Sequence, residues 1–205
     1  MRRITLTAAA ALAVVLTGCT SGPSAPIDER PYETRVLADR AAKDEFFRVG
    51  ERSPILADER ATFTGLPYFP ADPAYRVPAS LKEERQNPPV IILMATSADR
   101  PRRMQHVGTL SFALHGTSHT LSAYVEEGQS LRRLFVPFGD LTNGDETYEA
   151  GRNLELDRTA TGLYDLDFNA AYHPYCLYNA AYDCPIPPAA NRLTVPIRAG
   201  ERLAP

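Results

Sequence analysis

The sequence predicts a mostly β domain, built as an antiparallel sheet, a sandwich or a partly closed barrel, with one N-terminal helix. From residue 90 onward, short segments of alternating apolar and polar residues follow one another, with turn residues between them. No segment of helical periodicity separates these strand candidates, and this arrangement favours antiparallel pairing. The 18 prolines and the absence of tryptophan also indicate many turns and short extended pieces.

The first eighteen residues have the pattern of a secretory signal peptide. Arg2 and Arg3 supply positive charge, and residues 4–16 form an apolar run that is too short to span a bilayer. Small residues then lead directly into Cys19, which resembles the lipobox of bacterial lipoproteins. A lipobox cysteine is cleaved from the signal and acylated, usually with more than one chain, which makes a stable membrane anchor. The alternatives are an uncleaved anchor and a soluble secreted protein.

We therefore expect lipid attachment at Cys19 and a location on the extracytoplasmic side of the cell membrane, with the lipid bilayer as one partner. Residues 19–27 are rich in serine, glycine and proline, and they predict a flexible tether. Residues 28–205 are predicted to form one domain of ordinary size. The chain has 25 acidic and 22 basic residues and no broad basic segment, so nucleic acid is not expected as a partner.

Residues 28–50 predict the N-terminal helix. Pro31 suits the first helical turn, and Gly50 suits the end of the helix. Between them, apolar residues recur at helical spacing, namely Tyr32, Val36, Leu37 and Ala41. The helix either packs on the domain or presents a surface to a partner, and we favour packing. Prolines interrupt residues 53–87, which predict short extended pieces and turns.

The remaining segments predict the strands. Residues 110–114 and 121–125 alternate in polarity and form a predicted hairpin around Gly116. The further strand candidates are residues 90–94, 131–138, 153–156, 163–168 and 193–197. Pro196 would place the last of these strands at a sheet edge or a bulge.

Two cysteines, Cys176 and Cys184, remain for the folded domain in an oxidising compartment, and we expect them to form a disulfide. His173 together with these cysteines would supply three metal ligands but no fourth, so no metal is expected. By strand alternation, His119 lies on the inner face and His115 on the outer face, which argues against a shared metal site.

Polar side chains of the second half form the candidate site. One hypothesis is that they converge on a pocket in which arginines bind a carboxylate or phosphate and Asp167 acts as a general base with Arg152 and Arg192. The alternative, which we favour, is a structural network that holds irregular loops together. The candidate ligand-binding residues are Asp140, Tyr148, Arg152, Asp167, Asn169, Tyr172, Arg192 and Arg198.

Four tyrosines follow one another at short spacing: Tyr172, Tyr175, Tyr178 and Tyr182. They would either line a sugar or peptide groove or pack around the loop between the two cysteines. The sequence has no Gly-x-Ser-x-Gly nucleophile motif, phosphate-binding loop or dinucleotide fingerprint. No cofactor is therefore expected.

A series of ordered motifs connects the chain to a known family. The motifs are Lys43–Arg48, Ser53–Pro54, Gly65–Pro70, Phe135–Gly144, Thr147–Tyr148, Gly151–Arg152, Leu166–Tyr172, Pro174–Cys176, Cys184–Pro188, Asn191–Leu193 and Val195–Glu201. Over roughly residues 32–202, this series resembles the bacterial and archaeal family called domain of unknown function 1684. Three positions depart from the family pattern: His173 stands where asparagine is usual, Asn153 where tyrosine is usual, and Ala190 where glutamate is usual.

The resemblance implies a domain type and no particular reaction. The leading hypothesis is a non-enzymatic envelope lipoprotein whose domain binds an envelope ligand or protein, or takes part in an assembly. The alternative is a hydrolase that acts on an envelope component through Asp167, Arg152 and Arg192. A purely structural spacer is a third hypothesis, which the dense polar and aromatic residues of 135–201 disfavour.

Overall fold

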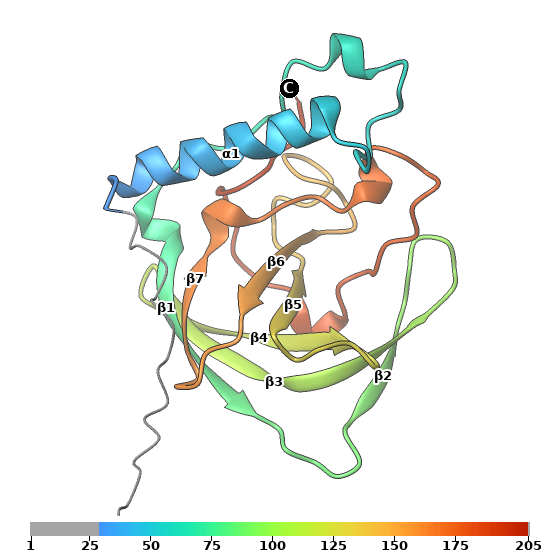
Figure 1. Cartoon of the computed structure of the whole chain (residues 1–205). Helices are drawn as coiled ribbons and strands as arrows, with labels where there is room; N and C mark the ends of the chain where they lie inside the picture. The colour runs from blue at the N-terminus through green and yellow to red at the C-terminus, as the bar shows by residue number, and fades with distance from the viewer. Residues whose placement is uncertain (1–28, 205) are drawn as a thin grey trace, which may run out of the picture.

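The computed structural model describes residues 29–204, which form a mostly β domain with one N-terminal helix (Figure 1). Its strands form one sheet that curves into a nearly closed barrel, and this confirms the predicted fold class. The predicted signal peptide (residues 1–18), the predicted lipid-attachment residue Cys19 and the predicted tether (19–27) lie outside the described residues. Among the helices of residues 29–204, none is long and apolar enough to cross a membrane.

The helix α1 (Tyr32–Val49) lies across one end of the barrel (Figure 1). Gly50 N–H closes its last turn on the carbonyl of Phe46 at 2.8 Å. Its buried residues are Val36 and Phe47, so a narrow face of the helix packs on the domain. The rings around Phe47 belong to Phe63, Tyr175 and Tyr178.

The sheet runs in the order β6-β5-β4-β3-β1-β7, and β2 also pairs with β3. The strands are β1 (Arg76–Glu83), β2 (Ile91–Met94), β3 (Arg102–Leu114), β4 (Thr117–Glu126), β5 (Arg133–Phe138), β6 (Arg152–Asp157) and β7 (Leu163–Asp167). Every pairing is antiparallel. The two outer strands meet through the segment after β7, because Asn153 and Tyr172 exchange backbone hydrogen bonds of 2.9 and 3.1 Å.

Strand alternation divides the apolar side chains between two faces. The inner face carries the largest hydrophobic cluster, which includes Leu110, Leu121, Leu134, Val136, Leu154 and Leu166. Tyr124 lies between Ala123 and Val125, which face inward, so its ring points to the outer face. There it packs with Met94 and Met104 in a second cluster. The barrel therefore has a filled interior and a second apolar patch on its outside.

The structure corrects two strand predictions. The eight-residue strand β1 lies within residues 53–87, where only short extended pieces and turns were expected, because Pro78 and its neighbours obscured the alternation. The predicted strand over residues 193–197 is wrong, since this segment is irregular. Its backbone N–H groups instead donate to the loop after β5. Leu193 N–H donates to Gly139 O at 2.8 Å, and Ile197 N–H donates to Asp140 Oδ1 at 3.1 Å. The side chains of Leu193 and Ile197 are nevertheless buried.

Candidate functional site

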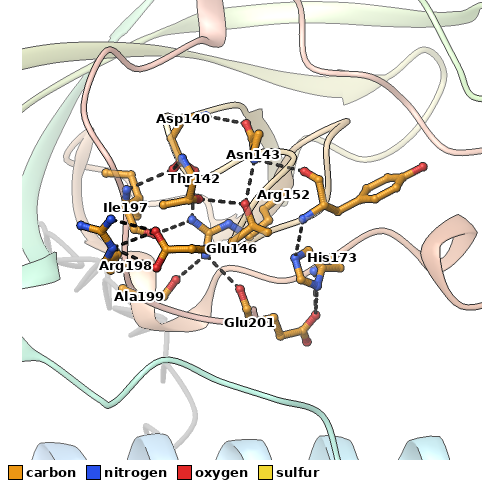
Figure 2. Close-up of polar contacts among 12 residues, drawn as sticks. Asp140, Thr142, Asn143, Glu146, Arg152, His173, Ile197, Arg198, Ala199 and Glu201 are labelled. Carbon is orange, nitrogen blue, oxygen red and sulfur yellow. Dashed lines mark hydrogen bonds and ion pairs between the residues drawn. The ribbon is translucent and has the colours of Figure 1, made fainter. Parts of the chain in front are cut away.

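Arg152 is the centre of a buried polar network (Figure 2). Its Nη2 donates to Asp140 Oδ2 at 2.9 Å, and both side chains are fully buried. Its Nη1 and Nη2 also donate to backbone carbonyls, those of Ile197, Ala199 and Glu201. Burial lowers the pKa of Arg152, and the charge of Asp140 opposes that shift. The network ties β6 to the C-terminal segment, and a ligand in solvent has no access to it.

The other carboxylate oxygen of Asp140 organises the loop after β5. Asp140 Oδ1 accepts from the Thr142 N–H at 2.9 Å, from its hydroxyl at 2.6 Å, and from Ile197 N–H. Asn143 Oδ1 in turn accepts from Asp140 N–H at 2.7 Å. These contacts satisfy the polar groups of an irregular buried loop, as the structural alternative predicts.

A second buried carboxylate, Glu201, joins α1 to the barrel. Glu201 Oε1 accepts from Lys43 Nζ at 2.5 Å, and Oε2 accepts from His173 N–H at 2.7 Å and from the Tyr178 hydroxyl at 3.0 Å. Sequence reasoning missed this group, because Lys43 and Glu201 are 158 positions apart and nothing in their separate motifs indicates that they pair.

His173 is a neutral acceptor within the same network. Burial lowers the pKa of His173 to about 3, assisted by the positive charges of Arg152 and Lys43. Its Nε2 accepts from the Tyr148 N–H at 3.2 Å, so the ring proton lies on Nδ1.

Asp167 and Asn169 lie apart from this network. Asp167 holds α1, and Asn169 holds the loop at Asp72. Both oxygens of Asp167 accept from the Tyr32 hydroxyl at 2.9 Å, and Oδ1 also accepts from Asn169 N–H. Asn169 exchanges hydrogen bonds of 2.9 and 2.8 Å with the backbone of Asp72. Both side chains are engaged in internal contacts.

The remaining arginines of the hypothesis lie apart from these groups. Arg192 is exposed and lies against Gly139, where an added Cβ would be 2.9 Å from Nη1. Arg198 is also exposed and forms an ion pair with Glu146. The structure therefore does not bring Arg152, Asp167 and Arg192 into one pocket.

A groove of about 690 Å³ lies between the second half of α1 and the outer face of the sheet. Its aromatic lining residues are Phe46, Phe47, Phe135, Tyr172, Tyr175 and Tyr182. These rings come from α1, from β5 and from the segment after β7, so three separate elements must fold together to form it. We call this hollow the aromatic groove.

The cations of the aromatic groove are already engaged. Lys43 pairs with Glu201 and lies 4.7 Å from the centre of the Tyr172 ring, and Arg102 donates to the carbonyl of Asp183. By contrast, the side chains of Asn153 and Glu126 line the groove and have no hydrogen-bond or ion-pair partner within residues 29–204. The polar groups of the groove that are free to bind a ligand therefore include an amide and a carboxylate.

The four tyrosines divide between the two roles considered for them. Tyr172, Tyr175 and Tyr182 line the aromatic groove, and Tyr172 donates to Glu155 Oε1 at 3.0 Å. Tyr178 instead packs against Phe47, with ring centres 5.2 Å apart, and donates to Glu201. Three of the four tyrosines therefore line a hollow, and Tyr178 packs on α1.

The two cysteines, Cys176 and Cys184, lie side by side next to the four tyrosines. Both are free thiols in this structure, and Cys184 Sγ accepts from the Cys176 N–H at 3.1 Å. The contact with the Cys184 thiol lowers the pKa of Cys176 to about 6. The disulfide stays a prediction, which this proximity supports. Across residues 29–204, no group of three or more His, Cys, Asp or Glu side chains is placed to hold a metal ion.

The fold and the aromatic groove define a class: a small β-barrel domain with a helix across one end and a groove beside that helix. The chain belongs to the family described as protein of unknown function (DUF1684), whose model matches residues 61–202. This finding confirms the resemblance seen in the motifs.

A solved structure supports the same assignment. The solution NMR structure of an uncharacterized protein from Haloarcula marismortui is 43% identical in sequence, with a TM-score of 0.66. The match covers 84% of this chain and 94% of the other. No curated protein matches this chain.

Proposed function

We propose that this chain is a membrane-anchored envelope lipoprotein whose barrel domain binds an uncharged saccharide in the aromatic groove. The lipobox pattern at Cys19 supports the anchor. The observation that carries the binding proposal is the groove itself, in which rings from three elements surround a hollow of about 690 Å³. Hollows of this size that combine aromatic walls with a few polar groups are typical of ligand sites.

The chemistry of the groove favours a neutral, hydroxyl-rich ligand. Lys43 pairs with Glu201, and three carboxylates (Glu126, Glu155 and Asp183) line the groove beside the two cations Lys43 and Arg102, so its acidic side chains disfavour an anionic ligand. The free carboxylate of Glu126 accepts hydrogen bonds, and the free amide of Asn153 both donates and accepts them. Sugar hydroxyls can hydrogen-bond to both groups, and the apolar faces of sugar rings can pack against the aromatic side chains.

The hydrolase hypothesis receives no comparable support. It required Asp167, Arg152 and Arg192 to face one substrate, whereas Arg152 is enclosed with Asp140 and Arg192 is exposed elsewhere. The binding proposal rests on groups that face a single open hollow.

Calorimetric titration of the purified protein with neutral envelope oligosaccharides tests the proposal, with peptides of similar size as a comparison. We expect oligosaccharide binding that weakens about ten-fold in Glu126→Gln, because a charge-assisted hydrogen bond is lost. Glu127→Gln is the matched control, since Glu127 pairs with Arg103 and does not line the groove. Binding of peptides alone, or equal effects of the two variants, would overturn the proposal.

A further inference from the structure

A second hollow lies where the β3–β4 hairpin meets the segment after residue 191. It has a volume of about 530 Å³ and shares no lining residue with the aromatic groove. Its polar side chains are Arg192, His119, Ser111, Ser118, Thr120 and Thr194. No carboxylate lines it.

These polar groups are available to a ligand. The four hydroxyls have no hydrogen bond to any residue within 29–204, and Arg192 has no ion pair there. His119 lies on the inner side of β4, as the alternation predicts, and its Nε2 is buried without a partner. By the same alternation Ser118 and Thr120 face the other side of β4, so the donors of the hollow are the guanidinium and the hydroxyls, without the buried ring. Donors therefore dominate the second hollow.

The backbone around Arg192 fixes its position on the barrel. The Asn191 side chain accepts from Ser122 N–H at 2.8 Å and donates to the carbonyls of Ser122 and Pro137 at 2.9 and 2.7 Å. Asn191 is fully buried, so this clamp joins the segment to β4 and β5. Gly139 then leaves room for the guanidinium, which a Cβ at that position would displace. Arg192 is thus an unpaired cation at a defined place.

We propose that this second hollow binds an oxyanion, specifically a phosphate group carried on a larger ligand. A planar guanidinium with several hydroxyl donors and no competing carboxylate is the arrangement that recognises phosphate. A soluble phosphate ester and the headgroup of an anionic phospholipid share this chemistry. The site is independent of the saccharide proposed for the aromatic groove, because the two hollows have no residue in common.

Hydrogen–deuterium exchange of the full protein, in phosphatidylcholine vesicles at low salt, tests this site. One arm adds glycerol phosphate, and the other replaces part of the phosphatidylcholine by phosphatidylglycerol. We expect slower exchange in segments 118–120 and 191–194 in at least one arm. Protection by glycerol phosphate identifies a soluble ester, and protection only by phosphatidylglycerol identifies a headgroup. No protection in either arm would overturn the proposal.

Matched variants separate a specific site from general charge effects. In Arg192→Gln, the concentration that gives half-maximal protection should rise about ten-fold or more, because bidentate hydrogen bonds are lost. Arg198→Gln removes the same charge from an exposed arginine that pairs with Glu146, and it should change the midpoint less than two-fold. Thr120→Val removes an exposed hydroxyl of the hollow and tests the same midpoint without altering charge. Equal effects of the two arginine variants would show that the second hollow is not the site. Unchanged midpoints in both Arg192→Gln and Thr120→Val would show the same.

Discussion

Arg152 and Asp140 form an ion pair from which solvent is fully excluded, with 2.9 Å between Nη2 and Oδ2. Removal of one partner leaves an uncompensated charge in the core, which typically costs about 3–5 kcal/mol. We therefore expect Asp140→Asn or Arg152→Met to lower the free energy of unfolding by several kcal/mol in urea titrations. Arg103→Gln, which breaks an exposed pair with Glu127, is the control and should leave the unfolding midpoint unchanged. Equal midpoints for all the variants would contradict a structural role of the buried pair.

His173 should make stability depend on pH. Its pKa is about 3 in the folded protein, below the value near 6.5 of an unfolded chain, so the unfolded state binds more protons between those limits. Stability should therefore fall as pH decreases from about 6.5 towards 3, by up to about 1.4 kcal/mol per pH unit from this residue. Unfolding measured across this range in His173→Asn should show a shallower decline than in the wild type. Parallel curves would mean that His173 does not carry the effect.

The Tyr32 hydroxyl links α1 to Asp167, with 2.9 Å to each carboxylate oxygen. A hydrogen bond to a charged group contributes about 1.5–3 kcal/mol when well sheltered, and this contact is only partly buried. Tyr32→Phe should thus destabilise the protein by about 1 kcal/mol and speed amide exchange at the start of α1. Exchange that is unchanged in α1 would show that Asp167 does not hold the helix.

The predicted disulfide between Cys176 and Cys184 has a direct test. The bridge should stabilise the domain by about 2–3 kcal/mol, because it closes a short loop in the unfolded chain. Protein from an oxidising compartment should melt at a lower temperature after reduction, whereas Cys176→Ser should be insensitive to reductant. Two thiols that react freely in the native, unreduced protein would rule out the bridge.

Lipid attachment at Cys19 is tested by labelling cells with a radioactive fatty acid. The wild-type protein should incorporate label and sediment with membranes, because acyl chains on one cysteine make a stable anchor. Cys19→Ser should lose the label and leave the membrane fraction. A labelled Cys19→Ser protein would place the lipid elsewhere.

The fold could be predicted to the extent that each element has its own local pattern. The hairpin of residues 110–125 alternates in polarity and forms as expected, since one face of each strand is buried. Residues 193–197 alternate as well, but Pro196 cannot donate to a ladder, and neighbouring donors are taken by Gly139 and Asp140.

The candidate site was less predictable, because its contacts join distant parts of the chain. The types of residue indicated a structural network around Asp140 and Arg152, and the structure contains one. The pairing of Lys43 with Glu201, and the assembly of Phe46 with Phe135 and Tyr182 in the aromatic groove, depend on tertiary packing alone. Sequence spacing carries no information about such contacts.

The most direct test of the central claim is an NMR titration of the isotope-labelled protein with a neutral envelope oligosaccharide. The account predicts that shifted resonances cluster at Phe46, Asn153 and Tyr182, and that Phe46→Ala weakens binding about ten-fold. Leu37→Ala, an exposed apolar residue of the same helix outside the groove, should bind as the wild type does. Shifts that cluster away from the aromatic groove, or equal losses in the two variants, would contradict the claim.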